Sequence, residues 1–326
     1  MTNSQKNAIR VAIEREIESL GSAAKVANKC QLNQAYISFM RNTAQWKRLI
    51  LKDEHWIRVA KALGVKPDAW QIVETMNTRT VVHVMEDAKE RSMFMAISYN
   101  AGSGKTANAI EYAKVNKTEN VFYFAVNHAD TNKVQFIRGL GTALGLDMSR
   151  MSGTANILAD SIIEFFVLRL DSRPLLIVDE ADKLTDQALK FFITLYNAVE
   201  GRMGCVIMGT ENLQKKIKRG VKNASNGFDE IDSRFGRRYI GLQGVTKHEA
   251  MKICDANGVS DKQLQAQIFE DSGPVTTVIS GRSVKVLNDL RPLVRLVQRE
   301  KLRMEEQAMG MMQVDEDVEA MEAQEA

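Results

Sequence analysis

The sequence predicts an α/β protein in which helices cover both faces of a parallel β-sheet, with an all-helical region before the sheet and a helical region after it. Three observations support this fold class. Short apolar runs alternate with amphipathic helical patterns, a turn of small residues separates the first run from its helix, and an acidic pair ends a later run. Uniformly apolar runs are typical of strands that are buried on both faces of a parallel sheet.

The N-terminal region, residues 1–76, is helical in pattern. Within it, AAKVANKCQLNQAYISFMRN (residues 23–42) spaces its apolar residues to pack two short helices around a tight turn, and Asn33 is placed to cap the second helix. This is the helix-turn-helix arrangement, in which the second helix enters the major groove of DNA. Gln31 occupies the turn position that often holds glycine, and a helical protein-docking module is the alternative. The side chains expected to contact DNA are Gln34, Tyr36, Ser38 and Arg41.

The middle of the chain follows after Thr75–Val84, a segment rich in Thr and Val that leads into it. Apolar runs of strand length are found at Met93–Ser98, Val121–Val126, Leu175–Val178, Cys205–Gly209 and Arg238–Leu242. Helical patterns separate them, starting at Gly104 and covering Thr131–Leu144, Thr154–Leu170 and Thr185–Glu200. Strands that alternate with helices in this way predict a parallel sheet covered on both faces.

A turn of small residues, YNAGSGKT, follows the first strand and opens a helix. Gly102 and Gly104 let the backbone curl so that successive N–H groups face a phosphate at the helix N-terminus. Lys105 would neutralise the β- and γ-phosphates of ATP, and the Thr106 hydroxyl would hold Mg²⁺. Tyr99 replaces the first glycine of the usual GxxxxGK[ST] pattern, which leaves the shape of the loop's entry open. The predicted ATP-binding residues are Asn100, Ala101, Gly102, Ser103, Gly104, Lys105 and Thr106.

The run PLLIVDEAD places two carboxylates at the end of a buried strand. Asp179 suits the shell of Mg²⁺, directly or through water. Glu180 suits orienting and deprotonating the attacking water as a general base. Because this pair follows the glycine-rich turn at the expected distance, the two runs together predict an enzyme that binds and hydrolyses ATP.

The region beyond Gly244 is predicted to be helical, over Lys247–Asn257, Asp261–Asp271 and Ser283–Met304, with an interruption at Pro292. The domain boundaries that follow are 1–76 for the helix-turn-helix region, 77–243 for the α/β core, 244–303 for a helical lid and 304–326 for a tail. That tail contains eight acidic residues and no Lys or Arg, so we expect it to be disordered.

The composition, with 44% hydrophobic and 26% charged residues in 326, is that of an ordinary folded protein. No apolar run approaches the roughly 18 residues of a membrane span, and the N-terminus lacks an apolar signal core, so we expect no membrane association. Three scattered cysteines argue against disulfides and zinc and favour a reducing cytoplasm. The whole-chain charge of +3 conceals a more basic body before the acidic tail, compatible with a polyanionic partner or with an ordinary solvated surface.

Basic residues concentrate at two places in the α/β core, where they would contact DNA phosphates rather than bases. The alternative is that these charges simply form solvated surface. The first group lies in KKIKRGVK and the second follows the second strand: Lys215, Lys216 and Lys218, then Lys133 and Arg138.

The order of helix-turn-helix, phosphate loop, Asp-Glu strand and lid resembles the Mu B-like transposition ATPases of the AAA+ superfamily. VANKCQLNQAYISFMRN, NAGSGKT, LLIVDEAD, VIMGT and VKVLND carry the resemblance. It implies a P-loop NTPase core and a polar sensor at Thr210 that helps to position the attacking water. It also implies an arginine finger in DSRFGRRYIGL that reaches a neighbouring subunit's γ-phosphate, with Arg234 first and Arg237 and Arg238 as rivals. The lid's sensor position falls at Lys285, where arginine is expected, with Arg282 one turn earlier.

By this resemblance, the leading hypothesis is an ATPase that binds double-stranded DNA with little sequence preference, oligomerises on it as a filament and delivers it to a transposase. Its gene would then belong to a phage or a transposon. The first alternative is a regulator whose helix-turn-helix binds one operator while ATP switches its oligomeric state. The second is a helicase-loader-type ATPase, which shares the same core.

Overall fold

The computed structural model describes residues 3–43, 46, 51–65, 70–129, 131–148, 154–279, 281–304 and 306. The chain divides into two compact units. One consists of Glu74–Thr246 with Gly273–Pro292, and the other of Met1–Val73, Lys247–Ser272 and Leu293–Ala326. Nearly all of the acidic tail predicted at 304–326 lies outside the described residues.

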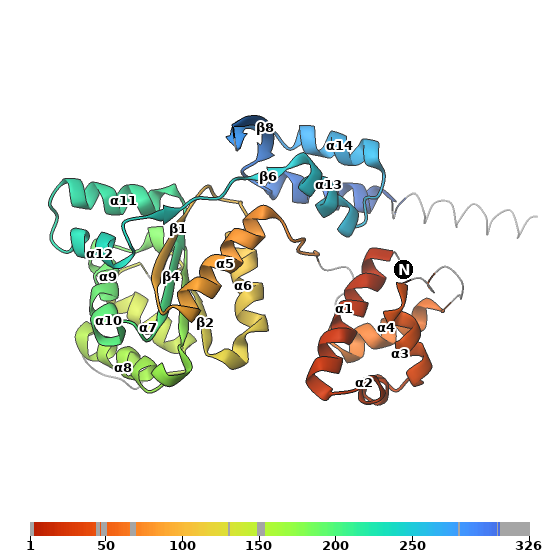
Figure 1. Cartoon of the computed structure of the whole chain (residues 1–326), viewed down its shortest axis with the longest axis horizontal. Helices are drawn as coiled ribbons and strands as arrows, with labels where there is room; N and C mark the ends of the chain where they lie inside the picture. The colour runs from red at the N-terminus through yellow and green to blue at the C-terminus, as the bar shows by residue number, and fades with distance from the viewer. Residues whose placement is uncertain are drawn as a thin grey trace, which may run out of the picture. The chain divides into compact units, whose positions relative to one another are not determined.

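A five-stranded sheet forms the centre of the first unit, in the order β2-β3-β4-β1-β5 (Figure 1). All four pairs of neighbouring strands are parallel, which confirms the predicted sheet. Because parallel strands end at the same edge, the residues after β1, β3 and β4 are brought together there. The strands are β1 (Phe94–Ser98), β2 (Val121–Ala125), β3 (Leu175–Asp179), β4 (Gly204–Gly209) and β5 (Tyr239–Ile240).

Helices cover both faces of this sheet (Figure 1). Successive residues of β3 alternate between the two faces, with Leu175 and Ile177 in one buried cluster and Leu176 and Val178 in the other. The first cluster includes residues of α5 (Met76–Glu90) and α6 (Lys105–Val115). The second includes residues of α7 (Lys133–Ala143), α8 (Ala155–Val167), α9 (Asp186–Leu189), α10 (Phe191–Val199), α11 (Glu211–Lys222) and α12 (Phe228–Arg234).

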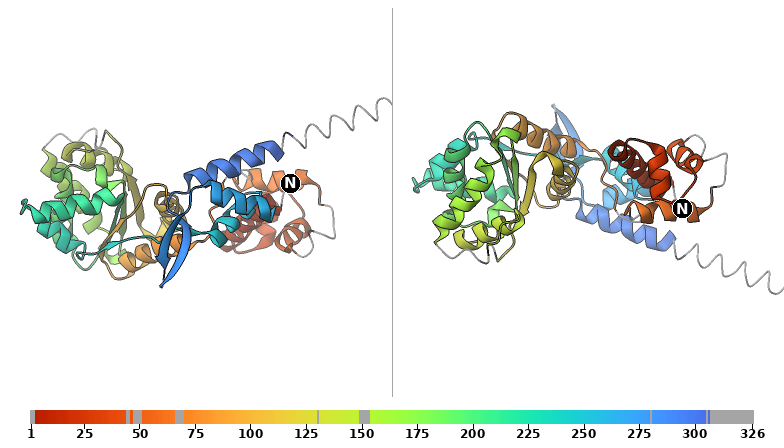
Figure 2. Two further views of the ribbon diagram at one scale, coloured as in Figure 1. Left: turned by 90° about the horizontal axis from the view of Figure 1, so that it is seen from above. Right: turned by 90° about the horizontal axis from the view of Figure 1, so that it is seen from below.

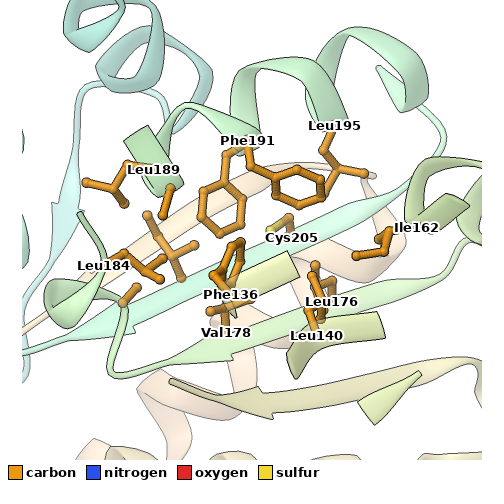
Figure 3. Packing of buried hydrophobic residues seen from close by; sticks show 14 of the residues in the cluster. Phe136, Leu140, Ile162, Leu176, Val178, Leu184, Leu189, Phe191, Leu195 and Cys205 are labelled. Carbon is orange, nitrogen blue, oxygen red and sulfur yellow. The ribbon is translucent and has the colours of Figure 1, made fainter. Parts of the chain in front are cut away.

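Aromatic rings fill much of the second cluster. Phe136 of α7 and Phe191 of α10, with ring centroids 5.7 Å apart, pack over Val178 and Cys205 of the sheet (Figure 3). Side chains of this size bury large apolar areas and prefer such tilted or edge-on contacts. The packing fixes the central strands, and therefore the residues at their carboxyl ends.

The segment Thr75–Val84, which leads into the core, is part of helix α5. Thr75 caps it by accepting a hydrogen bond from the Thr78 N–H, and its buried residues recur at helical spacing: Val81, Val84, Met85 and Ala88. The β-branched content of this segment concealed a helix whose stability comes from tertiary packing against the sheet.

The helix predicted at Ser283–Met304 is wrong over its first part, where the structure contains strands instead. A three-stranded antiparallel sheet of order β6-β8-β7 joins β6 (Val245–Thr246), β7 (Val275–Ile279) and β8 (Arg282–Leu287). Strands β7 and β8 form a narrow ribbon, blue in both views of Figure 2. Valines at alternate positions of β8 favour a strand, and Gly281, with φ of 78°, permits the tight turn before it. Residues 291–304 are helical.

The second unit is helical. It contains α1 (Asn3–Leu20), α2 (Ala23–Lys29), α3 (Gln34–Arg41) and α4 (Asp53–Ala62), packed around a buried cluster that includes Ile13, Ile37 and Trp56. It also contains α13 (Lys247–Ala256) and α14 (Lys262–Asp271), which confirm two of the predicted helices.

No helix in the described part of the chain is both long and apolar enough to span a membrane. The three cysteines are free and buried, as the prediction of no disulfides requires.

Candidate nucleotide site and basic surfaces

The phosphate loop joins β1 to α6. Gly102 and Gly104 have φ values of 75° and 90°, in the left-handed region that glycine adopts without strain. Lys105 opens α6 and is only 6% exposed. Its ammonium donates to the carbonyls of Tyr99 and Asn100, both at 2.8 Å, and to the Ser103 hydroxyl at 3.1 Å. The loop is therefore folded around the cation that would meet the phosphates.

Burial lowers the pKa of Lys105, and the negative charges of Asp179 and Asp182 oppose that shift. A buried ammonium whose only partners are neutral oxygens gains from an anionic ligand, since the ligand supplies the counter-charge that the loop lacks. The other predicted contacts differ in accessibility. Thr106 and Ala101 are exposed, Asn100 is half-buried and Ser103 is buried.

Asn77, at the start of α5, supports this loop and was not found by sequence reasoning. It is 1% exposed, donates to the Ser103 carbonyl at 3.4 Å and accepts from the Gln243 N–H at 3.2 Å. No motif marks such a residue, because its partners lie 26 and 166 positions away in the sequence.

Asp179 ends β3 and is 2% exposed. Its Oδ1 accepts from the Glu180 N–H at 2.8 Å, and its Oδ2 accepts from the Tyr123 hydroxyl of β2 at 3.1 Å. With Thr106, it offers the hard oxygen donors that Mg²⁺ prefers. No cluster of three His, Cys, Asp or Glu that would hold a metal exists among the described residues. The residues therefore fit Mg²⁺ held by one or two protein oxygens together with phosphates and water, where it would offset phosphate charge.

Glu180 lies just beyond the strand, with φ of 55°, before the short helix η4 (Ala181–Lys183). Its carboxylate forms an ion pair with the Lys183 ammonium and is 47% exposed. The predicted general base is thus paired with a cation of its own chain.

Thr210 follows β4 and caps α11 by accepting from the Asn212 N–H at 3.3 Å. Its hydroxyl donates to Asp182 Oδ2 at 2.7 Å, and its N–H donates to Asp182 Oδ1 at 3.2 Å. The predicted sensor is therefore tied to Asp182, a carboxylate of the DEAD run to which the sequence analysis gave no role.

The three arginines of the candidate finger segment have different surroundings. Arg234 lies 4.7 Å from the Tyr196 ring centroid and donates to Asn197 Oδ1 at 3.0 Å. Arg237 pairs with Asp229 at 2.9 Å, which raises the pKa of its guanidinium. Arg238 is exposed and has no hydrogen bond or ion pair within the described part of the chain.

The predicted lid sensor, Lys285, lies exposed on β8, opposite Thr276 of β7. The segment after β8 reaches the phosphate loop instead, because the Leu290 N–H donates to the Gly102 carbonyl at 2.9 Å. The next residue, Arg291, carries a positive charge that helps to lower the pKa of Lys105. Arg291 was missed by sequence reasoning, which took β8 for a helix and so misplaced the residues that follow it.

The lysines of α11 are not equivalent. Lys215 is exposed beside Glu211, whereas Lys216 donates to the carbonyls of Asp182 and Leu184 at 3.1 and 2.5 Å. Lys218 pairs at 2.9 Å with the buried carboxylate of Asp232. All three predicted phosphate contacts thus have a partner within their own chain, and the partner of Lys215 is Glu211 at 2.7 Å. Two basic side chains of this helix that were not predicted are exposed without ion pairs among the described residues: Arg219 and Lys222.

The two basic residues of α7 also contact their own chain. Lys133 donates to Asn156 Oδ1 at 2.8 Å, and Arg138 donates to the Met148 carbonyl at 2.7 Å. Both side chains are half-buried.

Helices α2 and α3 meet around a tight turn, and Asn33 caps α3 by accepting from the Ala35 N–H, as predicted. Gln31 has φ of 53°, which explains why glycine is common at this position. The outward residues Gln34, Tyr36 and Ser38 are exposed, with Tyr36 stacked on His55 at 4.7 Å. Arg41 pairs with Glu14 at 2.9 Å.

Residues 88–217 match the model of the AAA domain family. Together with the five-stranded parallel sheet, this match gives the unit a P-loop AAA+ fold and supports nucleotide binding and NTPase activity at the phosphate loop. No curated protein matches the chain.

Several solved structures are similar to this chain. Cdc6p from Pyrobaculum aerophilum has 16% identity and a TM-score of 0.48, over 64% of this chain and 57% of that one. The Aeropyrum pernix Orc1 protein in complex with DNA has 13% identity and a TM-score of 0.47, over 70% of this chain and 59% of that one. Domain III of the Thermotoga maritima replication initiation protein DnaA has 15% identity and a TM-score of 0.43, over 74% of this chain and 88% of that one. The chain thus spans less than two thirds of the first two proteins.

Proposed function

We propose that this chain is an ATPase whose ATP-bound copies assemble on duplex DNA. The single observation that carries the ATPase assignment is that a phosphate loop folded around Lys105 follows β1 at the same sheet edge where Asp179 and Glu180 follow β3, with β4 between the two strands. Lys105 and the loop N–H groups hold the phosphates, Asp179 and Thr106 hold Mg²⁺, and Glu180 takes the proton of the attacking water.

Assembly is proposed because the sequence resemblance implies an arginine finger that a neighbouring subunit supplies to the transferring phosphoryl group. Within one chain, Arg234 packs on Tyr196 and Arg237 pairs with Asp229, while Arg238 is exposed. A neighbouring subunit that presents one of these arginines would complete the site, since a finger supplied in trans stabilises the charge on the transferring group. Arg238 needs to break no contact to do so, and it is therefore as strong a candidate as Arg234. Arg291 replaces Lys285 as the proposed cation from the lid segment.

DNA binding is proposed on two surfaces. The exposed face of α3 presents Gln34, Tyr36 and Ser38 in the manner of a helix that enters a groove. On α11, Arg219 and Lys222 are exposed without ion pairs among the described residues, and they suit phosphates. Lys215 is exposed as well but would have to exchange its ion pair with Glu211. Arg41, Lys133 and Arg138 would each have to exchange a contact within their own chain for a phosphate.

The downstream role has two candidates. Delivery of target DNA to a transposase rests on the sequence resemblance to Mu B-like ATPases, and none of the structures compared above is a transposition protein. One of them is a replication initiation protein and another was solved with DNA. A helicase-loader-type role agrees better with these comparisons, although at such TM-scores the likeness is one of fold alone. An operator-binding regulator is the third hypothesis.

The test combines binding and footprinting on random duplex DNA, with a slowly hydrolysed ATP analogue, with ADP and without nucleotide. The proposal expects long protected tracts, visible as assemblies in electron micrographs, only with the ATP analogue. The slope of log K against log salt should be about −0.9 for each phosphate contact. Protection of one short sequence would favour the regulator, and DNA binding that ignores nucleotide would overturn the proposed coupling.

Matched variants of α11 sharpen the test. Replacing Arg219 and Lys222 by Gln should flatten the salt slope by about two phosphate contacts, roughly 1.8 units. Lys216→Gln removes a charge from the same helix but one that donates to carbonyls of the core, so it should leave the slope unchanged and lower stability instead.

A further inference from the structure

The segment Asn288–Leu290 lies directly on the phosphate loop. Its three residues make three contacts there. The Tyr99 hydroxyl donates to Asn288 Oδ1 at 2.8 Å, and the Leu290 N–H donates to the Gly102 carbonyl at 2.9 Å. Asp289 approaches so closely that a Cβ added to Gly102 would lie 1.8 Å from its Oδ1. Gly102 is therefore required both for its positive φ and for the approach of this segment.

The backbone contact of this segment uses a loop carbonyl. The Leu290 N–H donates to the Gly102 carbonyl, so among the described contacts the segment occupies none of the loop N–H groups that would face an anion. Asp289 Oδ1 also accepts from the Arg291 N–H at 2.9 Å, which closes a turn and fixes where the Arg291 side chain begins. The segment thus docks on the loop through a carbonyl, with Arg291 immediately after it.

Tyr99 makes this docking specific. It occupies the position where the usual phosphate-loop pattern has glycine, and a glycine there has no group that reaches Asn288, 189 residues away. Its ring is half-buried with the core cluster of α5 and α6, so the hydroxyl is presented from a fixed side chain. Burial is the main cause of the raised pKa of this hydroxyl, which keeps it protonated as a donor.

We propose that the hydrogen bond between Tyr99 and Asn288 is a tie that positions Arg291 at the terminal phosphate of bound ATP. Tyr99 and Asn288 are positioning residues in this scheme, and Arg291 is the group that contacts the nucleotide. The inference rests on the proposed nucleotide site. Its consequence is selective, because a cation at the third phosphate contributes to ATP binding and not to ADP binding.

The test measures dissociation constants for ATP and ADP by titration calorimetry, with EDTA and with Mg²⁺, on the full chain. Arg291→Ala should weaken ATP binding about tenfold or more and ADP binding by less than about twofold, as expected for a charge-assisted contact to the third phosphate. Tyr99→Phe and Asn288→Ala each remove one side of a neutral hydrogen bond and should weaken ATP binding about threefold to tenfold with the same ATP selectivity.

The double variants decide whether Tyr99 acts through Arg291. Tyr99→Phe combined with Asn288→Ala should be no worse than either alone, and Tyr99→Phe should add nothing in the Arg291→Ala background. Tyr112→Phe is the matched control, because this tyrosine is also half-buried in the cluster of α5 and α6 but lies on the helix, away from Asn288. It should change neither constant.

The outcomes separate this inference from the proposed function. If the parent protein binds ATP but Tyr99→Phe and Asn288→Ala bind it equally well, the tie is overturned and the nucleotide site stands. If both variants weaken ATP and ADP alike, the bond supports the loop's fold and does not position Arg291. If the parent binds neither nucleotide, the proposed function itself fails.

Discussion

The two halves of the proposed nucleotide site are built to different degrees. On the phosphate-holding side, Lys105 is buried inside its loop, and Asn77 supports that loop from α5. On the hydrolytic side, Glu180 is paired with Lys183 and the Thr210 hydroxyl is bonded to Asp182. In the first half Lys105 donates to neutral oxygens of its own loop, whereas each of these groups of the second half is bonded to a charged side chain.

This difference predicts that nucleotide binding and hydrolysis are separable in this protein. Groups preorganised by burial lose little further freedom when they bind a ligand. Groups held in ion pairs must exchange those partners first, and that exchange is where a neighbouring subunit or DNA can act on the rate. The comparison therefore predicts that variants of one half change affinity and variants of the other change turnover.

The largest effects are expected from variants that remove either ATP binding or ATP turnover without the other. Lys105→Ala should abolish ATP binding, because the loop loses the cation that meets the phosphates. Glu180→Gln should bind ATP as the parent does and lose about 10²–10⁴-fold in turnover, the usual contribution of a general base. Calorimetry and a phosphate-release assay separate these effects. Parental turnover by Glu180→Gln would remove Glu180 from the mechanism.

Loss of the finger comes next and tests whether the hydrolytic half is completed in trans. A finger is worth about 10³-fold or more in rate. Arg234→Ala and Arg238→Ala are each mixed with Lys105→Ala subunits on DNA, and the ATPase rate is followed against the mixing ratio. The variant that lacks the true finger should be inactive alone and should regain turnover in the mixture. The Lys105→Ala subunits then supply the missing arginine to neighbouring subunits whose phosphate loops are intact.

Recovery with Arg238→Ala and not Arg234→Ala would favour the exposed residue over the one packed on Tyr196. No recovery with either, when mixed assembly is confirmed by crosslinking, points to Arg237, whose ion pair with Asp229 would then have to open.

A smaller effect concerns Asp179, because the Mg²⁺ that it is proposed to hold would serve both phosphate binding and hydrolysis. Tyr123→Phe removes the hydroxyl that donates to Asp179 Oδ2 and leaves the ring in place. We expect the Mg²⁺ concentration for half-maximal ATPase to shift about twofold to tenfold, which matches the net worth of one hydrogen bond to a charged group. ATP binding in EDTA should not change. A change in EDTA with no Mg²⁺ dependence would make Tyr123 a purely structural residue.

The smallest expected effect concerns the ion pair that holds Glu180 on the hydrolytic side of the site. Lys183→Met keeps the length of the side chain and removes its charge, so Glu180 is no longer held in an ion pair. Exposed pairs are worth about 0.2–1 kcal/mol, so basal turnover should rise by no more than about fivefold. Lys190→Met, a half-buried lysine beyond η4, is the control and should leave turnover unchanged. A fall in turnover with Lys183→Met would show that Lys183 assists Glu180.

The sequence was informative wherever a local pattern carried the physics. The alternation of apolar runs predicted all five strands of the main sheet, and Asn33 was correctly placed as a cap. The prediction from sequence was wrong where a strand pattern and a helix pattern overlap. In β8, the alternating valines of a strand were taken for the start of a helix. The prediction also missed α5, since β-branched residues conceal a helix that packing stabilises.

The sequence alone determined which groups the site contains, namely a phosphate loop with Lys105 and two carboxylates at the end of a buried strand. It also determined that they lie at one edge of the sheet, because parallel strands end at the same edge. What only the tertiary structure decided is which charged groups are available. Lys218 is occupied by Asp232, Thr210 by Asp182 and Tyr99 by Asn288, which is 189 positions distant. A pairing of that kind depends on how distant segments pack, and no local pattern in the sequence specifies it.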